Sequence, residues 1–558
     1  MLPYEGKNGG SMNERKWQSY PRPQLKRDSY VNLNGTWELD GQKIQVPFAP
    51  QCSLSEYKGT VGEHLCYKTT FEIPSDFTQS RVILHFGAVD EVANVYVNDV
   101  HVGKHEGGYL HFSFDITDAI KRGEKNDLRV EVVDTLSRVY PYGKQCKKRG
   151  GMWYTPISGI WQTVWMENVP EEYIKGIKLT PSMKDIEITV LGNTKGFTAT
   201  VLDKGKVIAE ETYTENTGKV LIPNPTLWDV EHPHLYDLKI KAGEDEIESY
   251  FALRTVEIKK INGVQRVCLN DKPIFMHGLL DQGYYEDGIY LPGDEEEFTK
   301  DILRMKELGF NMLRKHIKIE PEKFYYECDR LGMLVIQDMV NNGGYSYILD
   351  TVLPTVGFKK RNDCKGRYQD AECKKVFEWH MKDTLHDLYN HPCIIGYTIF
   401  NEGWGQFESD RMYEIAKSID NTRFYDATSG WFAQKKSDLD SEHIYFRAEE
   451  LHPKDRPMFL SECGGFSYAV EGHMFNTEKS YGYGACKSTE ELTDRIVDMY
   501  EVMVLSGIKR GVCGCVYTQV SDVEDEINGM YTYDRQVCKV NKEKMKALAA
   551  RIYKEIEL

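Results

Sequence analysis

The stretch His391-Pro392-Cys393-Ile394-Ile395-Gly396-Tyr397-Thr398-Ile399-Phe400-Asn401-Glu402 is a short, almost continuous apolar run that ends on Asn-Glu. Such a run is typical of a parallel strand buried on both faces. A second stretch, Pro457-Met458-Phe459-Leu460-Ser461-Glu462, has the same design and is followed by Gly464-Gly465. The two terminal glutamates lie sixty positions apart in sequence. A carboxylate at the carboxyl end of such a strand is where α/β barrels place their chemistry.

Outward from these stretches, from about residue 258 to 558, predicted strands alternate with helices, which indicates a parallel sheet. The expected strands are 273–278, 311–316, 333–338, 391–402, 424–428, 443–446, 457–462 and 511–518. Eight β/α units in about 300 residues match a (β/α)8 TIM barrel. A doubly wound sheet of the same units is the structural alternative.

The chain before the barrel is predicted to be all-β. Residues 13–170 contain many short strands separated by turn signals, a pattern that indicates a jelly-roll sandwich. Residues 171–257 continue with alternating strands of a different character and suit an immunoglobulin-like sandwich. We therefore expect three domains, with boundaries near residues 170 and 257.

Composition excludes several classes of function. The chain of 558 residues carries a net charge of −16, which argues against a nucleic-acid partner because such a partner needs a basic face. The short basic run from Lys144 to Arg149 is interpreted as a solvated loop. No stretch is long and apolar enough for a membrane span. The 13 cysteines form no CxxC pair, so we expect no metal ion and no other cofactor. We expect a cytoplasmic protein with reduced thiols, and a signal peptide removed earlier is the alternative.

The two glutamates fit one reaction type. Hydrolysis of a glycosidic bond needs a group that donates a proton to the leaving oxygen. It also needs a second carboxylate that stabilises the positive charge developing at the anomeric carbon. A barrel can bring the ends of strands four and seven to about 5 Å from each other, which is the separation of retaining enzymes. For each glutamate alone, an ordinary residue at the barrel rim is the competing interpretation.

The ordered set of motifs resembles glycoside hydrolase family 2. Asn401-Glu402 and Glu462 carry the resemblance in the barrel. Elsewhere it rests on Val95–Asn98, His105–Tyr109, Ser158–Val164, Phe251–Glu257 and Leu269–Ile274, which resemble the family's jelly roll, its closing strand, the exit from its immunoglobulin-like domain and the entry to its barrel. The resemblance implies a retaining exo-glycosidase in which Glu462 is the nucleophile and Glu402 the general acid/base.

The resemblance also assigns substrate-binding residues. It implies that Asn401 binds the sugar 2-hydroxyl, that Tyr445 orients the nucleophile, and that His316 lies at the sugar site. Tyr517 stands where the family commonly has a tryptophan platform, so we expect its ring to stack on sugar. Asp281 and Trp404 are further candidates for contacts with the substrate. For Asn401, Tyr445, His316 and Trp404, capping, packing or an ordinary rim position in the barrel is the alternative interpretation.

The sequence departs from the family in ways that bear on the sugar. The family's β-glucuronidases carry an Asn-x-Lys motif after strand eight, whereas this chain has Asp525-Glu526-Ile527-Asn528-Gly529. We infer that Glu524, Asp525 and Glu526 would repel a uronate, and we expect a neutral sugar. β-Galactosidase is the commonest activity on neutral sugars in the family and is therefore the first candidate. The alternatives are α-L-arabinopyranosidase, β-mannosidase and β-glucuronidase.

Two function classes compete with hydrolysis. An inactive carbohydrate-binding protein would use the jelly roll as its binding module, but such a protein has no need for both glutamates. A transglycosylase would share the covalent intermediate and deliver the sugar to an acceptor other than water. By the resemblance alone, we also expect a homo-oligomer that acts on an oligosaccharide or glycoside.

Overall fold

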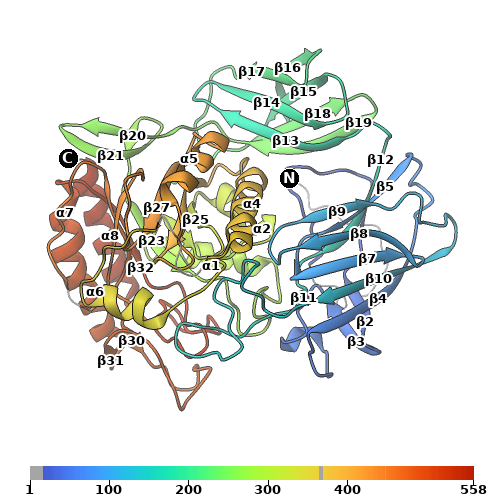
Figure 1. Ribbon diagram of the computed structural model, residues 1–558. Helices are drawn as coiled ribbons and strands as arrows, with labels where there is room; N and C mark the ends of the chain where they lie inside the picture. The colour runs from blue at the N-terminus through green and yellow to red at the C-terminus, as the bar shows by residue number, and fades with distance from the viewer. Residues whose placement is uncertain (1–16, 364–368, 447, 558) are drawn as a thin grey trace.

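A computed structural model describes residues 17–363, 369–446 and 448–557 and arranges them as two β-sandwiches beside a large barrel (Figure 1). Each of the three bodies has its own buried apolar cluster. The cluster of the barrel extends to Trp17, Tyr109, Tyr154 and Trp161 of the first sandwich, so the two share a packed interface.

The first sandwich consists of a six-stranded sheet, in the order β3-β2-β4-β10-β7-β8, and a four-stranded sheet, in the order β1-β12-β5-β9. Its pairs are antiparallel, and apolar side chains alternate along strands such as β7, as a half-buried sheet requires. The bounds are β1 Tyr30–Asn32, β2 Gly35–Leu39, β3 Gln42–Val46, β4 His64–Glu72, β5 Arg81–Phe86, β7 Val92–Val97, β8 Val100–Glu106, β9 Phe112–Asp115, β10 Lys125–Val133 and β12 Val164–Val169; the short β6 Val89–Asp90 pairs with β11 Gly159–Ile160.

The second sandwich packs a sheet of order β13-β14-β17 with one of order β16-β15-β18-β19. Its bounds are β13 Ile174–Pro181, β14 Asp185–Gly192, β15 Phe197–Asp203, β16 Lys206–Tyr213, β17 Thr217–Leu221, β18 Tyr236–Ala242 and β19 Asp245–Phe251. A small antiparallel sheet of β20 Val256–Ile261, β21 Val264–Leu269 and β22 Lys272–Pro273 leads into the barrel.

The barrel has eight parallel strands in the order β27-β26-β25-β24-β23-β32-β29-β28. Its bounds are β23 Met276–Asp281, β24 Met312–Lys315, β25 Leu334–Asp338, β26 Ile394–Asn401, β27 Phe424–Ser429, β28 Asp440–Ile444, β29 Met458–Cys463 and β32 Val512–Tyr517. In chain order, the first barrel strand, β23, pairs with the last, β32, in parallel. The predicted TIM barrel is therefore confirmed, and the doubly wound alternative is wrong. The remaining gap lies between β27 and β28, where the Ser441 hydroxyl donates to the Thr428 carbonyl at 3.3 Å.

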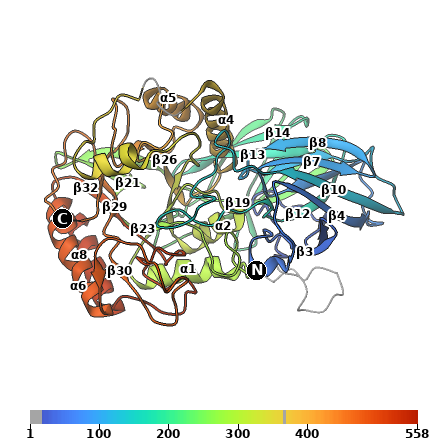
Figure 2. The same ribbon diagram turned by 60° about the horizontal axis from the view of Figure 1, so that its bottom comes forward.

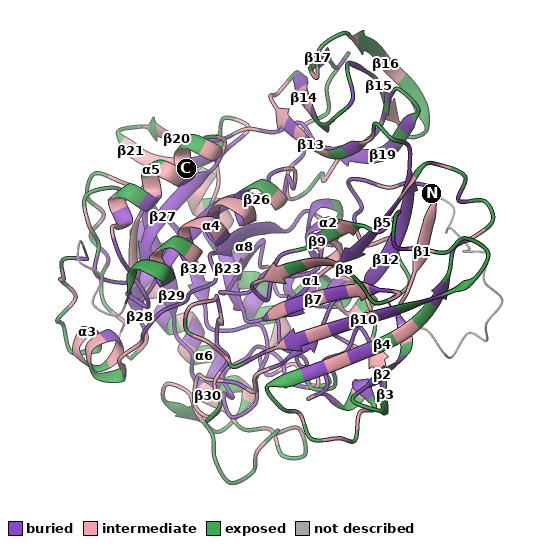
Figure 3. Cartoon of the chain, turned by 45° about the vertical axis from the view of Figure 1, so that its right-hand side comes forward, coloured by how far each residue is buried: buried purple, intermediate pink, exposed green. Residues whose placement is uncertain are grey.

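Burial explains why these runs form strands. All eight residues of β26 and all six residues of β29 are buried, as near-continuous apolar sequence in a parallel sheet requires (Figure 3). Helices surround the strands (Figure 2); they are α1 Glu296–Glu307, α2 Glu322–Leu331, α3 Leu353–Thr355, α4 Ala371–Asp387, α5 Ser409–Ile419, α6 Thr489–Tyr500, α7 Ser506–Ile508 and α8 Lys542–Glu557. Among the described residues, no helix combines the length and the apolar character that crossing a bilayer requires.

An ionic network joins the first sandwich to the second. Glu167 of β12 accepts from Arg22 at 2.9 Å and from Arg27 at 2.8 Å, and Arg27 also binds Asp245 of β19 at 2.7 Å. All four side chains are at most 11% exposed. Burial raises the pKa of Glu167, but Arg22, His85 and Arg27 outweigh it and hold the pKa below the ordinary 4.5.

We predict that Glu167→Gln destabilises the protein by about 3–5 kcal/mol at neutral pH, because two buried guanidinium groups lose their shared counter-charge. A carboxyl whose folded-state pKa is depressed contributes stability above its unfolded pKa and loses it as pH falls. The difference between wild type and variant should therefore shrink below about pH 4.5. Urea unfolding followed by tryptophan fluorescence measures both effects. Glu171→Gln, on the solvent-exposed partner of Arg81, is the control and should change stability by under about 1 kcal/mol.

Candidate active site

Glu402 follows the last residue of β26 and is fixed through its backbone. Its φ of 53° lies in the left-handed region, which a non-glycine residue rarely adopts. Its N–H donates to the Ser429 carbonyl at 3.0 Å, and the Trp431 indole donates to its carbonyl at 3.1 Å. The neighbouring strand β27 and the residues after it therefore hold the turn that aims the carboxyl into the barrel mouth.

Glu462 lies in β29 and binds a buried guanidinium. Arg314 of β24 donates to Glu462 Oε1 at 3.0 Å and to the Ser461 carbonyl at 3.0 Å. The same guanidinium binds Asp338 of β25 at 2.9 Å and the Asn401 Oδ1 atom at 2.9 Å. Arg314 is fully buried and joins the ends of four strands. Arg314 is not among the site residues predicted from the sequence.

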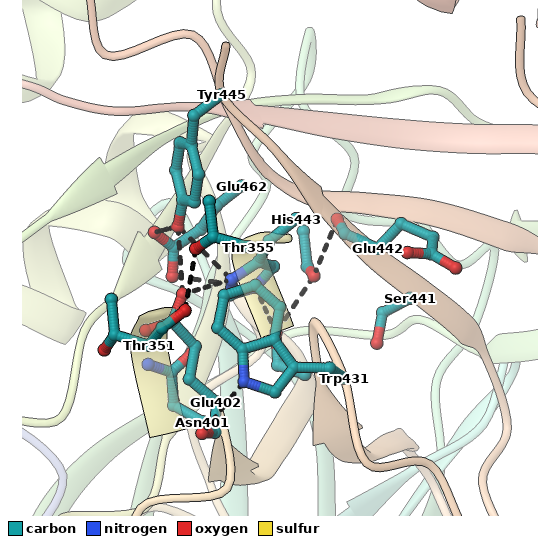
Figure 4. A network of polar contacts seen from close by, with 12 residues as sticks. Thr351, Thr355, Asn401, Glu402, Trp431, Ser441, Glu442, His443, Tyr445 and Glu462 are labelled. Atoms are coloured by element: carbon teal, nitrogen blue, oxygen red, sulfur yellow. Dashed lines mark hydrogen bonds and ion pairs between the residues drawn. The ribbon is translucent and has the colours of Figure 1, made fainter. Parts of the chain in front are cut away.

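Tyr445 and His443 stand between the two glutamates (Figure 4). The Tyr445 hydroxyl lies 2.8 Å from Glu462 Oε2 and 3.1 Å from Glu402 Oε1. His443 Nδ1 lies 2.8 Å from Glu402 Oε1. One carboxylate oxygen of Glu402 and one of Glu462 lie within 4.8 Å of each other. The carboxyls are thus close enough for both to reach the same small group.

Burial controls the protonation of this cluster. Burial, opposed most strongly by Lys144, raises the pKa of the Glu402 carboxyl above its ordinary value. Burial also lowers the pKa of His443 to about 3, so its imidazole is neutral at physiological pH. Among the described residues, Glu402, His443 and Glu462 are also the one group of three side chains whose ligand atoms could together hold a metal ion.

Asn401 and His316, both predicted from sequence, lie at this cluster. Asn401 ends β26, and its Oδ1 accepts from Arg314, which directs its NH2 group elsewhere. His316 follows β24, and its Nδ1 binds Asp338 Oδ2 at 2.7 Å. Burial lowers the pKa of His316. Glu462 and Lys144 also act electrostatically on that pKa, so His316 lies near both groups.

Three other sequence candidates are engaged in packing. The Asp281 carboxylate pairs with Lys315 at 2.7 Å, so it is not a free sugar contact. The Tyr517 hydroxyl accepts from the Phe466 N–H at 3.1 Å, and its ring packs against Gly464, so the expected stacking platform is not presented. Trp404 is 1% exposed, and Trp153 and Lys144 cover its ring. The residue types alone did not show that these local partners already engage the three side chains.

A loop of the first sandwich reaches the barrel mouth (Figure 1). Residues 134–158 leave β10 and pack on the barrel, where the Tyr142 N–H donates to the Asn341 carbonyl at 3.0 Å. The prediction of a solvated loop for the basic run is wrong at Lys144, which is 7% exposed, although Lys147 and Lys148 are exposed. The Lys144 ammonium lies 4.8 Å from the centre of the Trp404 ring.

The same loop binds the acidic residues after β32. Arg149 lies 3.6 Å from Glu524 and 3.3 Å from Asp525, and the Thr155 N–H donates to Glu524 at 2.9 Å. Glu526 accepts from the Asn528 amide at 2.9 Å and from the Tyr154 hydroxyl. The three carboxylates are therefore paired with donors from both domains, which weakens the inference that they repel an anionic sugar.

The chain matches three models of one family. Residues 39–156 match the glycosyl hydrolase 2 galactose-binding domain-like model, residues 176–254 match the glycosyl hydrolases family 2 model, and residues 256–455 match the family 2 TIM barrel domain. A β-galactosidase of Thermoanaerobacter pseudethanolicus is 27% identical over 384 residues, which cover 64% of this chain and 47% of that protein. A putative β-glucuronidase of Formosa agariphila is 27% identical over 514 residues, which cover 82% and 54%.

Solved structures share the fold. A β-D-glucuronidase from Dictyoglomus thermophilum has a TM-score of 0.74 at 20% identity and covers 95% of this chain and 98% of its own. A Ruminococcus gnavus β-glucuronidase has a TM-score of 0.74 at 17% identity, with coverages of 94% and 98%. The chain spans about half the length of the curated relatives named above. From the three matched domains and the barrel they build, the chain belongs to glycoside hydrolase family 2.

Proposed function

We propose that this chain is a retaining, exo-acting glycosidase in which Glu462 is the nucleophile and Glu402 the general acid/base. The observation that carries the proposal is the approach of the two carboxyls to within 4.8 Å. Retaining enzymes hold this pair about 5–5.5 Å apart, whereas inverting enzymes need about 6.5–9.5 Å to admit a water molecule. The raised pKa of Glu402 supports its assignment as the proton donor.

In the first step, Glu462 attacks the anomeric carbon while the bond from that carbon to the leaving oxygen breaks. Glu402 gives its proton to the leaving oxygen, and a covalent glycosyl–Glu462 ester forms. Arg314 and the Tyr445 hydroxyl hold the two oxygens of Glu462 before the attack. In the second step, Glu402 removes a proton from water, whose oxygen displaces Glu462 and restores the original anomeric configuration.

Asn401 and His316 are proposed to bind the sugar. Because Arg314 occupies Asn401 Oδ1, the amide presents its NH2 group as a donor for a hydroxyl. A donor to the 2-hydroxyl strengthens its hydrogen bond as charge develops at the neighbouring carbon. Asp338 fixes the ring of His316 through Nδ1, which leaves Nε2 for a second hydroxyl.

Two sugars are candidates for the cleaved residue. A neutral β-galactoside is favoured by the absence of a lysine in Asp525–Gly529, where an Asn-x-Lys motif would grip a uronate. A β-glucuronide is favoured by Lys144, a buried ammonium near Glu402 and Glu526 that could balance a sugar carboxylate. We propose the galactoside first and keep the glucuronide as the second candidate.

A panel of aryl glycosides tests the reaction and the sugar together. We expect release from the β-galactoside, with losses on the order of 10⁴-fold or more in Glu462→Gln and roughly 10²–10⁴-fold in Glu402→Gln with a poor leaving group. The panel also contains the β-glucuronide, β-mannoside, β-glucoside and α-L-arabinopyranoside. Release from the glucuronide alone would overturn the neutral-sugar assignment. Silence with every sugar would favour a binding protein, and transfer to added acceptor sugars would identify a transglycosylase.

The stereochemistry of azide rescue tests the two roles separately. In Glu462→Gly, azide can enter the emptied position and attack an activated β-glycoside, so the expected product is the α-glycosyl azide. In Glu402→Ala, the ester still forms from an activated substrate, and azide then yields the β-glycosyl azide. Nuclear magnetic resonance of the anomeric proton distinguishes the products. The opposite pairing of variant and product would exchange the two assignments.

Replacement of Lys144 tests its electrostatic effect on the proposed acid. Lys144 lowers the pKa of Glu402, so Lys144→Met should raise that pKa and move the basic limb of the kcat/KM profile to higher pH. Lys147→Met, in the same loop but on an exposed side chain, is the control and should leave the profile in place. A basic limb that stays fixed in Lys144→Met would show that the ammonium does not act on Glu402. A KM increase confined to the glucuronide would identify Lys144 as the uronate contact.

A further inference from the structure

His443 contacts the proposed acid directly and has no role in the mechanism described so far. It lies in β28, two residues before Tyr445, and its side chain is fully buried. Its Nδ1 atom lies 2.8 Å from Glu402 Oε1, and its Nε2 atom lies 2.9 Å from the Ser429 hydroxyl. The two ring nitrogens therefore have different partners, and the position of the ring proton decides what His443 does to Glu402.

A chain of hydrogen bonds fixes that proton. The Ser429 hydroxyl donates to the Ser461 hydroxyl at 2.9 Å, and the Ser461 hydroxyl donates to the Glu442 carbonyl at 3.4 Å. A carbonyl can only accept, so both hydroxyl protons point toward it. The Ser429 oxygen then has only lone pairs to offer His443. Consequently, Nε2 carries the proton, and the neutral imidazole presents a lone pair at Nδ1.

That lone pair faces a carboxyl oxygen at hydrogen-bond distance. Two acceptors 2.8 Å apart need a proton between them. Tyr445 cannot supply it while its single proton is donated to Glu462, its nearer carboxylate at 2.8 Å. The Tyr445 hydroxyl also lies 3.1 Å from Glu402 Oε1 and 3.3 Å from His443 Nδ1, but its one proton serves the shorter contact with Glu462, so the proton between Oε1 and Nδ1 must come from Glu402.

We propose that His443 is a positioning residue: its Nδ1 atom accepts a hydrogen bond from the protonated Glu402 carboxyl and so keeps the acid proton on Glu402. Ser429, Ser461 and the Glu442 carbonyl set the tautomer of His443. The inference rests on the proposed function and adds a residue to it. In the first step, the proton passes from Glu402 to the leaving oxygen. The carboxylate then faces the Nδ1 lone pair, which favours recovery of a proton from the attacking water in the second step.

The surrounding charges agree with a proton on the carboxyl. Burial raises the pKa of Glu402 and lowers that of His443 to about 3, so the proton of the pair belongs to Glu402. The titratable and charged groups that face the pair come from the loop, from β24, β25 and β29, and from the segments after β24 and β28; they are Lys144, Arg314, Asp338, Glu462, His316 and Tyr445. Lys144, Arg314 and His316 each lower the pKa of Glu402. A neutral acceptor at Nδ1 is therefore more important for keeping the proton on the carboxyl.

Two substitutions test the proposal by different routes. His443→Phe removes the acceptor, and Ser429→Ala removes the partner that holds the proton on Nε2 and frees the ring to donate from Nδ1. Both should lower the pKa of Glu402 and move the basic limb of the kcat/KM profile to lower pH. Near neutral pH, we expect a loss of roughly 10-fold or more with a phenyl glycoside, which needs an acid. A dinitrophenyl glycoside, whose leaving group needs little protonation, should lose much less.

Matched variants separate this effect from damage to the fold. Ser429→Thr keeps the hydroxyl and should restore the wild-type profile, whereas His101→Phe changes an exposed histidine of β8 and should leave the profile unchanged. Infrared spectroscopy supplies a readout without substrate. The wild type minus Glu402→Gln difference should contain a protonated-carboxyl band at neutral pH that disappears in His443→Phe and in Ser429→Ala.

The outcomes are distinguishable. A basic limb and a carboxyl band that stay unchanged in folded His443→Phe and Ser429→Ala would overturn the proposal, as would a shift of the limb to higher pH, which would mean that Nδ1 donates. Activity that is lost in a chelator and restored by Zn²⁺ would also overturn it, since a metal ion would then take the place of the proton. If the wild type cleaves no glycoside, the proposed function fails, and the infrared band still decides the role of His443.

Discussion

The buried guanidinium of Arg314 is the interaction on which the barrel mouth depends. A charge that is fully removed from water is tolerated only when it is paired and hydrogen-bonded. Asp338, Asn401, the Ser461 carbonyl and Glu462 supply that pairing from three strands next to or across from β24. Satisfying one cation therefore sets the relative positions of the ends of β25, β26 and β29. Both proposed catalytic carboxyls stand at or beside these ends, so the same constraint that stabilises the barrel also brings them together.

The fold could be predicted from sequence because its signal is local. Near-continuous apolar runs such as β26 and β29 have few stable environments other than a parallel sheet covered on both faces. Both glutamates could be predicted because they interrupt such runs abruptly. Arg314 escaped notice for the converse reason. A charged residue inside a strand carries no local mark of being buried, since its partners lie 24 to 148 positions away along the chain.

The rest of the site was hidden by contacts between domains and by pairing within the barrel. Lys144 belongs to a basic run that is typical of a solvated loop, yet it is buried and its ammonium contacts Trp404 in another domain. Tyr517 stands at a family position and Asp281 is a polar residue at the end of strand one, yet the Phe466 N–H and Lys315 already engage them. His443 could have been found. Residues i and i+2 of a strand share a face, so a tyrosine expected at the nucleophile implies that the histidine two positions earlier points the same way.

The two carboxyls are chemically identical, and their surroundings divide the work between them. Glu462 accepts from a guanidinium and from the Tyr445 hydroxyl, and both donors remain satisfied by an ionised carboxylate. No guanidinium among the described residues donates to Glu402, and its closest partner is an imidazole nitrogen whose proton lies on the far side of the ring. A donor-rich environment suits a nucleophile, and an acceptor suits an acid that must keep its proton until the leaving oxygen arrives. Tyr445 touches both carboxyls but has one proton, so donating it to Glu462 obliges Glu402 to supply its own. The Glu442 carbonyl thus fixes the direction of the hydrogen bonds through Ser461, Ser429 and His443, and this direction leaves the proton of the pair on Glu402.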